Sequence, residues 1–165
     1  MTMSKANNEV YQVQNPAIGS AILWRFICGY KSVKSEPAPF PLLFLVLPII
    51  FREELCDAIS STQQRKGLSK VAEKLFTEKK NDELYSINSA AINLRELTLS
   101  SFNIGVSAKL FALEYTTALV YPITEITPSG IAASTKVLLD SAEKFGRLCG
   151  DLTLYEICEW LKVRF

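Results

Sequence analysis

The sequence predicts a mainly α-helical domain with one β-hairpin, in a winged-helix-like arrangement. Three observations lead to this prediction. Apolar residues recur at helical spacing through most of the chain, the stretch Leu119–Ile126 is rich in β-branched residues, and a helical pattern returns after it. A chain of 165 residues fits one domain and can bury about two-thirds of its unfolded surface in a single core. We therefore expect a flexible N-terminal arm over residues 1–13 and one domain over residues 14–165.

The first helix is expected to begin at Asn15-Pro16. Asn is a favoured N-cap, and proline at the first helical position loses no hydrogen bond that the helix needs. A broad apolar face continues to about Cys28, and Gly29 is the expected stop. Two prolines then predict an irregular loop over residues 30–39.

The segment Phe40–Phe51 reads FPLLFLVLPIIF and carries no charge. It is too short to span a bilayer, so we expect a buried helix that starts near Pro41 and is disturbed at Pro48, where the amide donor is missing. A helix that is apolar all round must be covered on all sides. Either the protein's own helices cover it, or a partner subunit covers one face.

The middle of the chain alternates helical and polar segments. Arg52–Ser61 reads as a short amphipathic continuation, and Leu68–Lys79 as a helix with an apolar face. Asn81–Ser86 is a polar break. Ile87–Leu113 is predicted to be one long helical region, with Gly105 as a candidate interruption.

Lysines recur every four residues near the Leu68–Lys79 helix. Lys66, Lys70 and Lys74 are expected on one face, and Lys79 and Lys80 extend the positive region. Such a stripe is ordinarily a solvated helix face. The alternative is a contact surface for an acidic partner or a nucleic-acid backbone.

The C-terminal third contains the predicted hairpin and two further helices. The strands are expected at Leu119–Ile126 and Ile131–Thr135, joined by the turn Thr127-Pro128-Ser129-Gly130. A helix over Val137–Leu148 follows. Thr153 and Glu156 then form a capping box that opens the last helix.

Composition and charge exclude several classes of protein. Eighteen basic against seventeen acidic residues give a net charge of +1, so no overall field recruits nucleic acid or an anionic membrane. The 48% hydrophobic content is slightly high, which indicates apolar surface for a partner.

The N-terminus lacks an apolar signal stretch, so we expect a cytoplasmic protein with reduced thiols. The four cysteines form no CxxC pair: Cys28, Cys56, Cys149 and Cys158.

Histidine and two common phosphate-binding motifs are missing from the sequence. There is no histidine, which removes an imidazole base, a Ser-His or Cys-His pair and a His-bearing metal site. There is no GxxxxGK[ST] loop and no GxGxxG turn to hold a nucleotide phosphate. Carboxylates remain as candidate catalysts in the pairs Glu53-Glu54 and Asp82-Glu83, but adjacent residues on a helix point in different directions and nothing nearby marks either pair as tuned. We therefore expect a protein that is not an enzyme and that has no cofactor or metal.

The N-terminal third resembles a known family. Asn-Pro-Ala opens the first helix, Gly-Tyr follows at its expected end, and a proline-flanked apolar run comes next at the family's spacing. This pattern is similar to the N-terminal signature of the middle-component family of bacterial three-component ABC ATPase systems. A looser likeness continues through Arg95–Phe102 and Ala142–Phe165. The signature positions are Asn15, Pro16, Gly29, Tyr30, Pro39, Phe40, Pro41, Leu45 and Pro48.

The resemblance implies a non-catalytic adaptor between an SMC-like ABC ATPase and an effector, often a nuclease, in a Lamassu-type defence complex against phage or plasmids. It implies that DNA is reached through the complex, and it supplies no catalytic residue. Family members commonly have a longer segment where this chain has Arg65–Lys80. The alternative is a winged-helix DNA-binding regulator. The expected wing, Tyr121–Gly130, contains Glu125 and no Lys or Arg, which favours the adaptor.

Overall fold

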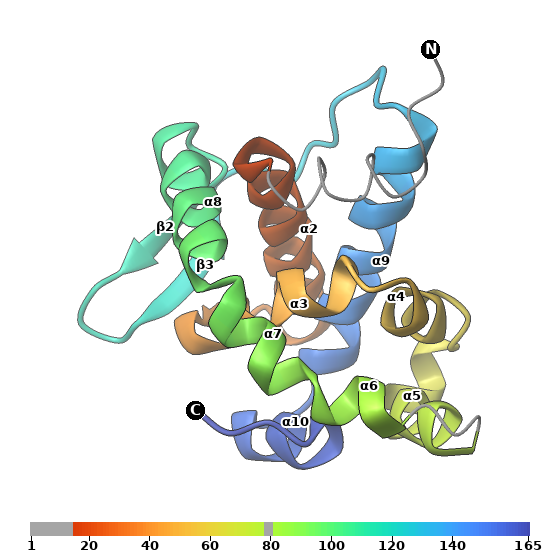
Figure 1. The fold of residues 1–165 in the computed structure, drawn as a ribbon. Helices are drawn as coiled ribbons and strands as arrows, with labels where there is room; N and C mark the ends of the chain where they lie inside the picture. The colour runs from red at the N-terminus through yellow and green to blue at the C-terminus, as the bar shows by residue number, and fades with distance from the viewer. Residues whose placement is uncertain (1–14, 78–80) are drawn as a thin grey trace.

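Helix α2 (Pro16–Lys34) is the central element of the computed structural model, which describes residues 15–77 and 81–165. It packs against α9 (Ala133–Cys149) and α8 (Arg95–Ser107), as Figure 1 shows. Every residue of α2 from Ile22 to Tyr30 is buried. A helix covered by neighbours on several sides needs apolar residues around most of its circumference, which explains the broad apolar face of this segment.

The start of α2 is as predicted, but its end is not. Asn15 caps the helix, its side-chain oxygen accepting a hydrogen bond from the Ala17 amide at 3.0 Å. The predicted stop at Gly29 is wrong, because α2 continues to Lys34. Gly29 lies where α2 meets α9, and a Cβ there would overlap the backbone carbonyl of Glu143. The glycine therefore permits close packing of two helices and does not end one.

The apolar segment Phe40–Phe51 is buried as predicted, but it is not one regular helix. It forms a 3₁₀ helix, η1 (Phe40–Leu45), followed by the short helix α3 (Val46–Ile50). Pro48 falls in the first turn of α3, where an amide would have no intrahelical acceptor, so the helix tolerates it. In the structure the chain's own elements, including α2 and α7, contact this segment.

The region after α3 is divided more finely than the sequence predicts. The predicted break at residues 81–86 contains a helix, and the predicted long helix over residues 87–113 is divided at Leu94, passes through Gly105 and ends at Ser107. The predictions for residues 1–13 and for Lys79 and Lys80 lie outside the described residues. The elements are α4 (Glu53–Ser60), η2 (Gln64–Lys66), α5 (Gly67–Thr77), α6 (Asn81–Tyr85) and α7 (Ile87–Asn93).

The sheet has three antiparallel strands in the order β1-β3-β2. The hairpin consists of β2 (Phe111–Glu114) and β3 (Leu119–Pro122), and β1 (Ala38–Pro39) pairs with β3. The predicted turn at residues 127–130 and return strand at 131–135 are wrong, because α9 already begins at Ala133. The mainly α fold with one hairpin is confirmed. A helix directly before the hairpin, with an earlier strand added beside its second strand, is a winged-helix-like arrangement.

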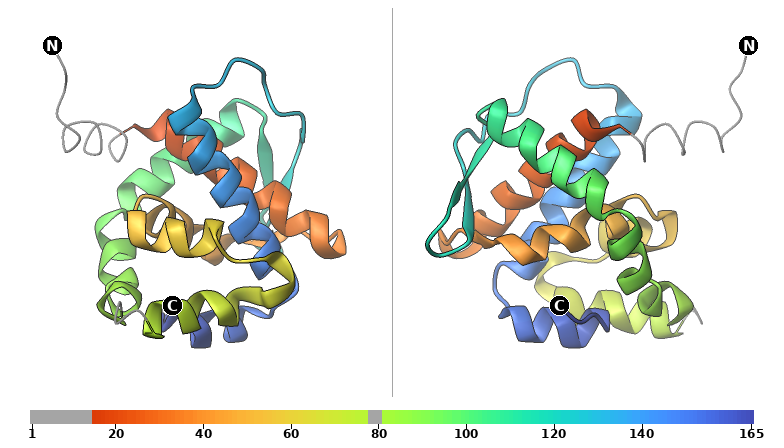
Figure 2. Two further views of the ribbon diagram at one scale, coloured as in Figure 1. Left: turned by 90° about the vertical axis from the view of Figure 1, so that its right-hand side faces the viewer. Right: turned by 60° about the vertical axis from the view of Figure 1, so that its left-hand side comes forward.

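The last helix, α10 (Leu154–Leu161), begins with the predicted capping box. The Thr153 hydroxyl accepts a hydrogen bond from the Glu156 amide at 3.2 Å, and the Glu156 carboxylate accepts one from the Thr153 amide at 2.7 Å. Figure 2 shows α10 and α5 together at the end of the molecule opposite the start of α2.

Candidate interaction surfaces

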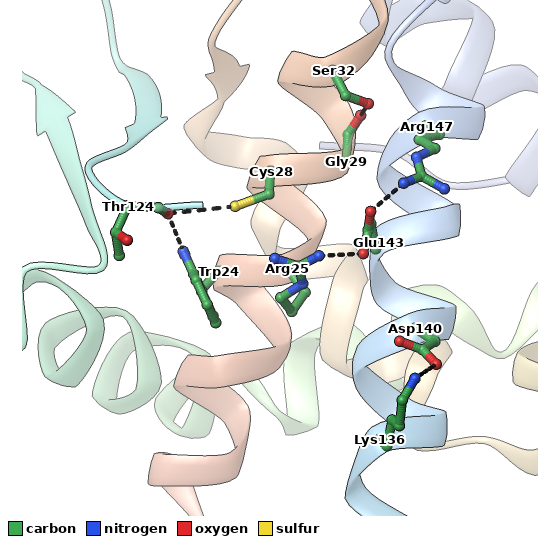
Figure 3. Close-up of polar contacts among 10 residues, drawn as sticks. All are labelled: Trp24, Arg25, Cys28, Gly29, Ser32, Thr124, Lys136, Asp140, Glu143 and Arg147. Carbon is green, nitrogen blue, oxygen red and sulfur yellow. Dashed lines mark hydrogen bonds and ion pairs between the residues drawn. The ribbon is translucent and has the colours of Figure 1, made fainter. Parts of the chain in front are cut away.

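A polar cluster joins α2 to α9 where the two helices pack together (Figure 3). The Glu143 carboxylate accepts hydrogen bonds from the guanidinium groups of Arg25 and Arg147. The side chains of Arg25 and Glu143 are 10% and 20% exposed. Burying either charge alone would be costly, so each provides the counterion that the other needs. This carboxylate is used to hold two helices together, and two cations share it.

Hydrogen bonds and an ion pair connect the loop after β3 to α2. The backbone carbonyl of Thr124 accepts hydrogen bonds from the Trp24 indole at 2.7 Å and from the Cys28 thiol at 3.7 Å (Figure 3). Lys31 and Glu125 add an ion pair at 3.7 Å. Burial raises the pKa of the Cys28 thiol to about 11, so the thiol stays protonated at neutral pH. A protonated thiol is a poor nucleophile and a poor metal ligand.

The other cysteines are also buried or half-buried. Burial raises the pKa values of Cys56, Cys149 and Cys158, and Cys149 is completely buried. Within residues 15–77 and 81–165, no group of three or more His, Cys, Asp or Glu side chains is placed to hold a metal ion.

The signature residues of the N-terminal third have structural positions. Asn15 and Pro16 start α2, and Tyr30 is buried near Phe26, with 6.3 Å between the ring centroids. Phe40 packs edge-on against Phe102 of α8 at 5.0 Å. These positions shape the core and form no common exposed site. The remaining ones occupy the α2–α9 crossing, β1, η1 and α3: Gly29, Pro39, Pro41, Leu45 and Pro48.

The lysine stripe is less regular than its spacing predicts. Lys66 ends η2 and precedes Gly67, whose φ of +75° separates it from the regular turns of α5, so its predicted place on the helix face is wrong. Lys70 forms an ion pair with Glu73 at 3.0 Å, and Lys74 donates a hydrogen bond to the Ser61 hydroxyl at 3.1 Å. A contact role for these lysines stays a prediction.

Lys74 also has a neighbour that the sequence did not reveal. Lys144 of α9 donates a hydrogen bond to the Ser60 carbonyl at 2.6 Å, so both lysines reach the C-terminal end of α4. Partial negative charge at a helix C-terminus attracts cations. Burial, and then the charge of Lys74, lower the pKa of Lys144. These two ammonium groups therefore have a local structural function.

A cavity of about 500 Å³ lies beside the stripe, between the start of α5, the end of α9 and α10. Arg65, Arg147 and Trp160 line it together with several apolar side chains. Asp151, the acid in this lining, forms an ion pair with Lys34 at 3.0 Å. Arg147 and Arg65 also have partners within the chain, the Glu143 carboxylate and the Gln63 side-chain oxygen, so the charged groups of this lining are already engaged.

No helix among the described residues is both long and apolar enough to cross a membrane. Residues 3–165 match the family model described as ABC-three component (ABC-3C) system Middle Component 3. No curated protein and no solved structure matches the chain.

Proposed function

Because the chain belongs to the Middle Component 3 family of ABC-three component systems, we propose that it is a non-catalytic adaptor that joins an ABC ATPase to an effector. The family match over residues 3–165 is the observation that carries this proposal. A middle component works together with the other components of its system. The function of this chain is therefore exerted through protein contacts.

The chemistry of the described side chains supports a role without catalysis. The Glu143 carboxylate joins two helices, and Asp151 in the 500 Å³ cavity is paired with Lys34. The Cys28 thiol stays protonated at neutral pH. A catalytic acid, base or nucleophile needs a pKa tuned to its reaction and access to a substrate. These groups serve packing, which suits an adaptor.

The proposed partners are those that the resemblance of the N-terminal signature to the middle-component family implies. The ATPase is of the SMC-like kind, the effector is a nuclease, and the complex acts in the cytoplasm against phage or plasmids, as in Lamassu-type systems. DNA engages the ATPase, and the adaptor holds the effector until that engagement releases it. DNA is thus reached through the complex.

A winged-helix DNA-binding regulator is the second candidate, because α8 directly precedes the hairpin and β1 adds to β3. Regulators of this kind use cations on the recognition helix and wing to contact phosphates. Residues 110–135, which contain the whole hairpin and the following loop, include no Lys or Arg. This composition favours the adaptor.

Co-expression with the neighbouring ATPase and effector genes, followed by purification on an ATPase tag, tests the proposal. We expect all three chains to co-purify and to elute as one complex. The adaptor proposal fails if this chain elutes alone while ATPase and effector pair without it. Binding of the isolated chain to a labelled DNA duplex at about 100 mM salt, at affinities typical of specific regulators, would support the second candidate instead.

A further inference from the structure

The three-stranded sheet has one face toward the core and one face away from it. Side chains alternate between the faces along a strand, and directly opposed residues on paired strands share a face. Phe111 and Val120 are fully buried and mark the core face. The register opposes Ala112 to Tyr121, and both Pro39 and Glu114 to Leu119, on the other face. Ile123 continues the alternation of β3, and its amide donates a hydrogen bond to the Leu110 carbonyl at 2.9 Å.

Apart from Glu114, this outer face is apolar, whereas the water-facing side of a sheet is usually polar. Tyr121 is 44% exposed and Ile123 is 54% exposed, and Leu119 is not among the residues packed on the core. Within the described residues, the elements that contact the hairpin leave these side chains accessible, and Figure 1 shows the hairpin projecting from the helical body. Aromatic residues with few charges are typical of the centre of a protein–protein interface.

The tip of the hairpin is held in one conformation by its own side chains. The Glu114 carboxylate accepts hydrogen bonds from the amides of Thr116 at 3.1 Å and Thr117 at 2.8 Å, and from both hydroxyls. These bonds lower the pKa of Glu114 to about 2. Tyr115, at the tip, is 85% exposed. An aromatic side chain on a preorganised turn loses little conformational freedom on binding.

The charge of the region restricts what can dock there. Residues 110–135 contain two acidic residues, Glu114 and Glu125, and no Lys or Arg. Glu125 is paired with Lys31, while Glu114 adds a negative charge to the sheet face itself, which disfavours nucleic-acid backbones and anionic lipids. A second copy docked about a two-fold axis would place the same acidic residues near one another. The complementary surface is a protein patch with an apolar centre and a basic rim.

We propose that this outer sheet face is the docking surface for another protein component of the system, one that presents an apolar patch with a basic rim. This proposal rests on the proposed adaptor function and assigns it a surface. The face consists of Pro39, Ala112, Glu114, Leu119, Tyr121 and Ile123, with Tyr115 at its tip.

The test compares a double variant, Tyr121→Lys with Ile123→Lys, with a matched control, Ile92→Lys with Tyr155→Lys. The control residues are exposed apolar side chains on α7 and α10. Each variant is co-expressed with the ATPase and effector and purified on each partner's tag. We expect the sheet-face variant to lose at least tenfold in recovery with one partner, while the control is recovered like the wild type. Tyr121→Ser with Ile123→Ser replaces the lysine variant if circular dichroism shows that the latter is unfolded.

Each outcome separates this inference from the adaptor proposal. If wild-type chain does not assemble with either partner, the adaptor proposal itself fails. If the wild type assembles and the folded sheet-face variant assembles equally well, the docking surface is wrong. Light scattering provides a further check: a wild-type dimer that becomes a monomer in the sheet-face variant, with complex assembly intact, would make this face a self-interface and overturn the inference.

Discussion

Arg25 of α2 and Glu143 of α9 form an ion pair that is largely buried where the two helices cross. Replacing Glu143 by Ala would leave the Arg25 guanidinium in the crossing without that counterion. We expect the free energy of unfolding to fall by about 3 kcal/mol, measured by urea denaturation. Asp140→Ala is the control, because its pair with Lys136 is exposed and such pairs contribute roughly 0–1 kcal/mol. Equal losses in both variants would contradict a special role for the buried pair.

The burial of η1 makes Leu45 a second sensitive position. Its side chain is 2% exposed, so Leu45→Asp would place an uncompensated charge in the core. We expect a loss of several kcal/mol, on the order of 4, which is a large fraction of the roughly 5–15 kcal/mol by which most domains are stable. Soluble expression and thermal melting measure it. Ile92→Asp is the control, since Ile92 is 75% exposed and should change stability by about 0.5 kcal/mol or less. A Leu45→Asp protein that folds like the control would place Leu45 at the surface.

The lysine stripe can be tested by changing Lys66, Lys70 and Lys74 together to Glu. Lys70 and Lys74 already have partners within the chain, so we expect complex assembly and any DNA response of the complex to be unchanged. Co-purification and DNA-stimulated ATPase activity at several salt concentrations measure this. A flatter salt dependence, by about one unit of slope per lost phosphate contact, would instead show that these lysines bind DNA. Loss of assembly would assign them to a subunit contact.

The Cys28 thiol predicts how stability changes with pH. Its pKa is raised from 9.0 to about 11 in the folded protein, so the folded state holds a proton that the unfolded chain releases above pH 9. This contribution to stability is complete below pH 9 and is lost as the pH rises toward 11. We expect wild-type protein to lose about 2 kcal/mol more than Cys28→Ala between pH 8.5 and 10.5 in urea titrations. Parallel losses in both proteins would show that Cys28 does not titrate in this way.

Local signals in the sequence were sufficient where neighbouring residues determine the structure. The Asn15-Pro16 start of α2 and the Thr153–Glu156 capping box were predicted because each is complete within four residues. The burial of Phe40–Phe51 followed from its lack of charge. The candidate docking face could not be predicted, because it depends on β1 pairing with β3 across eighty residues of chain.

The sequence by itself determined a mainly α domain with a hairpin, the starts of α2 and α10 and the most apolar segment, because apolar periodicity and capping act within one or two turns. The tertiary structure decided the rest. Gly29 reads as a stop in sequence, yet Glu143 from α9 packs against it and the helix continues. The Tyr115–Ala118 turn contains no Gly, Pro or Asn from which it could be predicted. The Glu114 carboxylate stabilises it by accepting hydrogen bonds from the Thr116 and Thr117 amides. Packing between distant segments can outweigh a local preference of about 1 kcal/mol, and only the folded chain shows which segments meet.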